Sequence, residues 1–105
     1  MKRQILTDAG RMLVQQWQLP ELQLREEASE YLTHLKHRLA DRIRELLETD
    51  MEHLINLLYR LDISETDFQR AMQGDHIYHT AQDLAEIVLN RELQKARTRA
   101  AYRNR

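Results

Sequence analysis

One apolar run in the middle of the chain, Asp50–Ser64, constrains the fold more than any other feature of the sequence. If this run is helical, successive residues advance by about 100° around the axis. Its apolar side chains then cover more than half of the circumference: Met51, Leu54, Ile55, Leu57, Leu58 and Leu61. A surface helix needs only one apolar stripe, so a helix of this kind should have neighbours on two or three sides. We therefore predict a central helix over residues 51–61.

The composition favours an all-α fold around that helix. The 105 residues include only 2 Gly and 1 Pro, whereas a β architecture needs many turns, and helix formers such as Leu, Glu, Gln, Arg and Ala are abundant. A chain of this length forms one domain with a single core. We expect a small bundle of about five helices.

Local signals predict the other helices over 5–17, 20–48, 65–73 and from Thr80 onward. Pro20 is suited to a helix start, and Ser64 to capping the helix that follows it. The second helix carries a seam of heptad type: Leu24, Ala28, Tyr31, Leu32, Leu35, Leu39, Arg42, Ile43 and Leu46. A capping box from Thr49 to Glu52 would separate this helix from the central one, although a continuous helix through Asp50 is the alternative.

Charge is distributed unevenly along the chain. Residues 91–105 carry six basic residues and one acidic residue, a local charge of +5, while the other ninety residues carry −6. Apolar content also falls after Leu93, so we expect the last helix to leave the body there. The predicted organisation is a helical domain over 1–93 and a basic extension over 94–105.

The basic extension is the main candidate for contact with a partner. The candidate contact residues are those of the extension together with Arg91 just before it: Arg91, Lys95, Arg97, Arg99, Tyr102 and Arg103. Clustered cations suit an acidic protein, or the phosphates of a nucleic acid on whose bases Tyr102 could stack. The extension could equally dock on the acidic body of its own chain or of a second copy.

Two groups of histidines are candidates for other chemistry. On the second predicted helix, four residues that are potential metal ligands form one row: Glu30, His34, His37 and Asp41. This row lies opposite the apolar seam, so a metal site there would be open to solvent. His76 and His79 fall in a predicted loop over 75–79, where they could contact a small anion.

Several function classes have no support in the sequence. There is no Cys, no Gly-x-Ser-x-Gly turn and no phosphate-binding glycine loop, so we expect neither covalent catalysis nor a cofactor. DNA binding by a helix–turn–helix over 51–73 is disfavoured, because it would place carboxylates against the DNA phosphates. No apolar stretch reaches membrane-spanning length and the N-terminus does not resemble a signal peptide, so cytoplasmic residence is expected.

Two blocks, LINLLYRLDISE over 54–65 and AEIVLNRELQKARTR over 85–99, resemble those of small bacterial helical proteins with no assigned activity. The resemblance implies an α-helical fold and no catalytic residues. We expect a non-enzymatic helical protein–protein interaction module, an adaptor or regulatory subunit that binds another protein or a second copy of itself. The alternatives are a nucleic-acid accessory protein acting through the tail and a metal-dependent activity at a histidine cluster.

Overall fold

The computed structural model describes residues 2–22 and 27–103, and these residues form five α-helices and no strand. The predicted all-α bundle is confirmed. The helices are α1 (Arg3–Trp17), α2 (Ala28–Thr49), α3 (Met51–Arg60), α4 (Glu65–Met72) and α5 (Ile77–Arg103). Leu24 of the predicted seam and Arg105 of the predicted tail lie outside the described residues. None of the helices within the described ranges is both long and apolar enough to cross a membrane.

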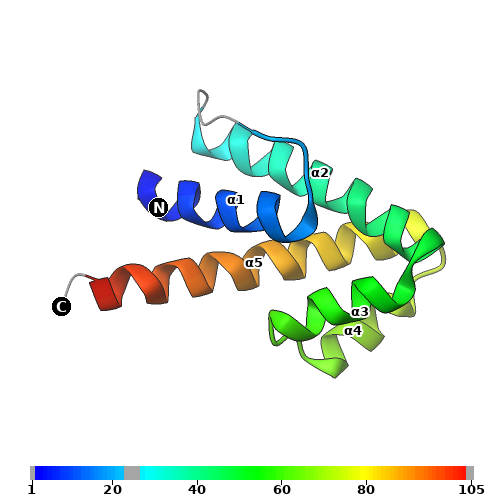
Figure 1. Ribbon diagram of the computed structural model, residues 1–105. Coiled ribbons are helices and arrows are strands. Elements are labelled where there is room, and N and C mark those ends of the chain that lie inside the picture. Colours follow the sequence, from blue (N-terminus) through cyan, green and yellow to red (C-terminus); the bar gives the residue numbers. More distant parts are fainter. Residues whose placement is uncertain (1, 23–26, 104–105) are drawn as a thin grey trace.

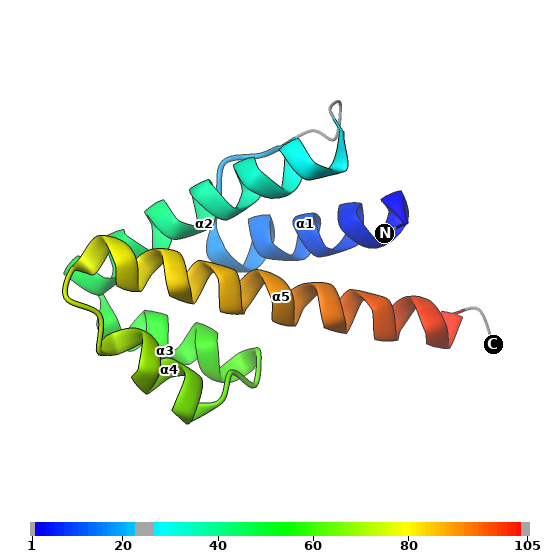
Figure 2. The ribbon, with the colours of Figure 1, turned by 180° about the vertical axis from the view of Figure 1, so that it is seen from behind.

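The helix at the centre of the bundle is α5, not the predicted helix over 51–61. Figures 1 and 2 show α5 running between α1 and α2 on one side and α3 and α4 on the other. Its 27 residues span about 40 Å at 1.5 Å per residue, close to the 41 Å length of the whole molecule. It packs against α1, α2 and α4, whereas α3 packs chiefly against α2. A helix of 10 residues is too short to contact all the others.

The apolar surface of α3 is only partly buried. Leu54 is fully buried, and only 3–4% of the surface of each of three other leucines is exposed: Leu57, Leu58 and Leu61. In contrast, Ile55 is 47% exposed and Met51 is 36% exposed. The prediction that the leucines of this run lie in the core is confirmed, while the prediction that neighbours on two or three sides cover the apolar surface of this helix is wrong.

The break between α2 and α3 lies at Asp50, as the sequence predicted, but the cap differs. The Asp50 carboxylate accepts a hydrogen bond from the backbone N of His53 at 3.1 Å, so Asp50 is the N-cap of α3. Thr49 instead donates back to the carbonyl of Glu45 at 2.7 Å. The expected capping box on Thr49 is therefore wrong by one residue.

The start of α2 lies at Ala28 rather than at Pro20. α1 and α2 run in the same direction (Figures 1 and 2), so the chain between them must return along α1, a distance of about 22 Å. A helix that began at Pro20 would advance only about 12 Å by Ala28, which is short of that distance. The described residues 19–22 are accordingly non-helical.

The ends of α4 and α5 confirm one prediction and correct two others. Ser64 caps α4 as expected, accepting from the backbone N of Asp67 at 3.1 Å. α5 begins at Ile77, three residues before the predicted start at Thr80, which is itself buried. At its other end α5 does not leave the body after Leu93: Ala96 is fully buried, and the helix continues to Arg103.

Candidate functional site

The six tail residues predicted to contact a partner do not share one surface. Residues of a helix are about 100° apart, so this segment of α5 points its side chains in several directions. Arg99 and Arg103 reach an acidic residue on α1, whereas Arg91 and Lys95 reach the turn between α3 and α4. The tail is therefore not a single basic patch.

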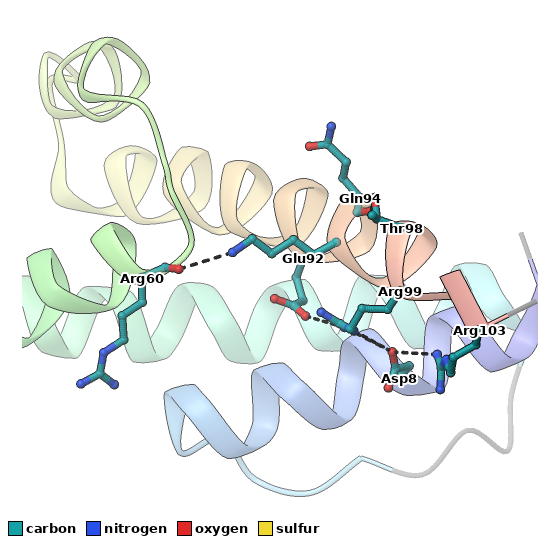
Figure 3. A network of polar contacts seen from close by, with 8 residues as sticks. Asp8, Arg60, Glu92, Gln94, Thr98, Arg99 and Arg103 are labelled. Carbon is teal, nitrogen blue, oxygen red and sulfur yellow. Dashed lines mark hydrogen bonds and ion pairs between the residues drawn. The ribbon is translucent and has the colours of Figure 1, made fainter. Parts of the chain in front are cut away.

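Arg99 of α5 contacts two carboxylates, Glu92 of its own helix and Asp8 of α1, and the second contact links α5 to α1 (Figure 3). Its Nη2 donates to Glu92 Oε1 at 3.0 Å and its Nε donates to Asp8 Oδ2 at 3.2 Å. Arg103 lies 3.6 Å from the same Asp8 oxygen. Burial works against the charge on Arg99, but its hydrogen bonds to Glu92 and Asp8 outweigh that effect and hold the pKa of the guanidinium above its usual value. Because the Glu92 side chain is only 1% exposed, this arginine supplies the counter-charge that a buried carboxylate needs.

Arg91 and Lys95 hold the C-terminal end of α3. Arg91 Nε donates to the carbonyl of Leu61 at 2.9 Å, and Lys95 Nζ donates to the carbonyl of Arg60 at 3.4 Å. Both cations also lie within 3.7 Å of Asp62 Oδ2. Cations at a helix C-terminus satisfy its last carbonyls and oppose its partial negative charge. These two predicted partner contacts therefore fix the turn that joins α3 to α4.

Three of the six predicted contact residues of the tail are exposed: Arg97, Tyr102 and Arg103. Arg97 is exposed and forms no ion pair with the described residues, and Tyr102 is 66% exposed. Arg103 pairs with Asp8, so Arg97 is the one exposed cation of the six that has no ion pair with a described residue.

The histidine row on α2 does not form a metal-binding group. Glu30, His34, His37 and Asp41 are all exposed, and the described residues contain no cluster of three or more His, Asp or Glu arranged to hold a metal ion. His37 and Asp41 instead line an open hollow of about 310 Å³ together with Tyr78 of α5. The guanidinium of Arg44 lies 5.1 Å from the centre of the Tyr78 ring at this hollow, a cation–π contact between α2 and α5.

His76 and His79 have structural positions different from those predicted. His79 lies within the first turn of α5 rather than in a loop. His76 precedes that turn, and its Nδ1 accepts a hydrogen bond from the backbone N of Tyr78 at 3.0 Å. His76 thereby satisfies one of the free N–H groups at the start of α5, the part that an N-cap side chain plays.

The most distinctive surface feature is an apolar groove between α3 and α4, which we call the α3–α4 groove. It encloses about 510 Å³ and is lined by Ile55, Leu58, Tyr59, Ile63, Glu65 and Phe68. Tyr59 is 82% exposed and Ile55 is 47% exposed. α3 packs chiefly against α2 and α4 packs against α5, and the groove lies between these two differently anchored helices.

Sequence reasoning missed this groove because it assigned Ile55 and Met51 to the core. A signal was present, since Met51, Ile55 and Tyr59 are spaced at i, i+4 and i+8 and so lie along one side of a helix. The leucines of α3 form a separate stripe that is enough to anchor a short helix. An apolar surface wider than one packing stripe is thus the pattern from which an exposed docking face could have been predicted.

Comparison with known proteins gives no relative: no protein-family model, curated protein or solved structure matches this chain.

Proposed function

We propose that this chain is a non-enzymatic, cytoplasmic protein–protein interaction module whose α3–α4 groove receives one amphipathic helix of a partner protein. The observation that carries the proposal is the groove itself, with exposed Ile55 and Tyr59 on one side and Phe68 on the other. Two helices with an apolar channel between them are the usual receptor for a third helix, whose apolar residues enter at i, i+3 or i+4 and i+7.

The chemistry of the groove supports a protein ligand rather than a small polar one. Glu65 is the only charged residue among those that line it, and Tyr59 offers a large, rigid apolar surface with a polar tip. Tyrosines of this kind are enriched among the residues that contribute most to interface affinity. An 82% exposed tyrosine beside other exposed apolar side chains has much surface left to bury on binding.

No observation favours the two alternatives. Binding of nucleic acid through the tail would need its cations on one face, but four of the six residues are engaged with Asp8, Glu92, Asp62 or backbone carbonyls. Metal-dependent activity would need convergent ligands, and the histidine row lies along one exposed helix face.

The proposal is tested by titrating the full chain with a set of synthetic amphipathic helical peptides and following backbone amide shifts by NMR. We expect shifts concentrated on α3 and α4, and loss of binding in Tyr59→Ala. Tyr102→Ala is the matched control, because it removes another exposed tyrosine from a distant part of α5. Binding that survives Tyr59→Ala but not Tyr102→Ala, or a complete lack of binding by the set, would overturn the proposal.

A further inference from the structure

The α3–α4 groove is bordered by carboxylates on both of its helices. Glu65 lines the groove from α4. Glu52 precedes Ile55 by three residues on α3, which places it beside Ile55 on the same side of that helix, and its side chain is exposed. Neither carboxylate forms an ion pair with a described residue; Glu65 accepts only a long hydrogen bond, 3.5 Å, from Gln69. The apolar groove thus has one carboxylate in its lining, Glu65, and a second, Glu52, next to it on α3, and neither charge is neutralised by a described residue.

The cations of the same two helices are directed elsewhere. Arg70 pairs with Asp67 at 3.8 Å and lines a different hollow, on the side of α4 that faces α5. Arg60 follows Tyr59 on α3 but is not among the residues that line the groove. Across residues 48–75 seven acidic and two basic residues give a local charge of −5, so the surroundings of the groove are acidic as well as its edges.

This charge pattern bears on which molecule occupies the groove. A second copy docking through the same surface would form a symmetric contact, in which each patch faces itself. Glu52 and Glu65 of one copy would then face the same carboxylates of the other, and like charges brought together at an interface oppose association. In contrast, a ligand with cations beside its apolar residues would be attracted by Glu52 and Glu65, and this attraction would favour association.

We infer that the α3–α4 groove selects a basic amphipathic helix of another protein, with apolar residues at i, i+4 and i+7 and Lys or Arg flanking them. The inference rests on the proposed function and adds the chemistry of the partner. In this arrangement Ile55, Tyr59 and Phe68 contact the apolar face of the partner helix. Glu52 and Glu65 then contact cations on its two flanks, which fixes its orientation and speeds its encounter with the groove.

The test compares two helical peptides with the same apolar face, one flanked by lysines and the other by glutamates, for binding to the full chain by fluorescence anisotropy. We expect the basic peptide to bind more tightly, with an affinity that falls as salt is raised. The variant Glu52→Gln/Glu65→Gln should weaken its binding by about fivefold, since exposed pairs each contribute modestly. Glu30→Gln/Asp41→Asn, which removes two exposed carboxylates from α2, is the matched control and should leave binding unchanged.

The outcomes separate this inference from the proposed function. Equal binding of both peptides, unaffected by Glu52→Gln/Glu65→Gln, would overturn the basic-partner inference and leave the groove as a helix receptor. Failure of both peptides to bind would overturn the proposed function itself. Concentration-dependent dimerisation of the chain alone, abolished by Tyr59→Ala in sedimentation measurements, would identify a second copy as the occupant and also overturn the inference.

Discussion

Gly10 allows α1 to approach α2 closely. The residue is buried, and a Cβ at this position would lie 1.9 Å from Tyr31 Oη and 2.9 Å from Tyr31 Cζ. The tyrosine is itself only 5% exposed. Burial raises the pKa of its phenol above the usual value, and the charge of nearby Arg11 offsets only part of this rise. From the sequence, Gly10 was only a weak point in a helix; in the fold it is the space that the Tyr31 ring occupies.

We predict that Gly10→Ala destabilises the protein although alanine is the better helix former. The intrinsic gain is about 1 kcal/mol, but forcing a rigid buried ring to move costs about 1–3 kcal/mol. The free energy of unfolding, measured with urea, should therefore fall. In a Tyr31→Leu background, which shortens the obstructing side chain, the same change should be neutral or stabilising. A rise in stability on introducing Gly10→Ala into the unmodified chain would contradict the close contact.

Two arginines secure the ends of helices by the same arrangement. Arg42 of α2 donates through Nε to the carbonyl of Trp17 at 3.0 Å, and Arg91 of α5 donates through Nε to the carbonyl of Leu61 at 2.9 Å. Each carbonyl is followed by a left-handed residue whose side chain contacts the same arginine: Gln18 (φ 56°) for Arg42 and Asp62 (φ 58°) for Arg91. Each arginine also contacts the residue three positions later on its own helix, Glu45 or Gln94. Each arginine thus caps the C-terminal end of a helix next to its own: Arg42 of α2 caps α1, and Arg91 of α5 caps α3.

We expect Arg42→Met and Arg91→Met each to lower the free energy of unfolding by about 2 kcal/mol, because each leaves a helix-end carbonyl without its charged donor. Arg97→Met is the control; it removes an exposed arginine from the same helix as Arg91 and should change stability by less than about 0.5 kcal/mol. Only Arg91→Met should also weaken peptide binding, because only Arg91 supports the turn beneath the α3–α4 groove. Equal effects of Arg91→Met and Arg97→Met in urea unfolding would rule out the capping role.

At the scale of the whole molecule, α5 is the element that unites the two halves. Its first part packs with α2 and α4, and its last part packs with α1 through Ala96 and the contacts of Arg99 and Arg103 with Asp8 (Figure 3). The predicted boundary after Leu93 therefore falls within a continuous helix, and Ala96 beyond it takes part in the core.

Ending the chain after Leu93 should accordingly disrupt more than the residues removed. Glu92 would lose Arg99 and α1 would lose its polar contacts with α5, so we expect α1 to unfold or exchange freely. The checks are helix content by circular dichroism and hydrogen exchange of α1 amides. Arg97→Gln in the full chain is the control for loss of tail charge alone and should retain protection. Full protection of α1 in the shortened chain would mean that the segment is a separable extension.

The sequence by itself determined the features that depend on near neighbours along the chain. Helical content, the break at Asp50, the Ser64 cap and burial of the α3 leucines all follow from periodicity and local hydrogen bonding. The tertiary structure alone decided the rest, because each remaining feature depends on how distant helices are directed. It placed α5 rather than α3 at the centre and engaged four cations of the predicted tail in contacts with other parts of the fold. It also left Ile55 and Tyr59 uncovered, since α3 and α4 are anchored to different helices.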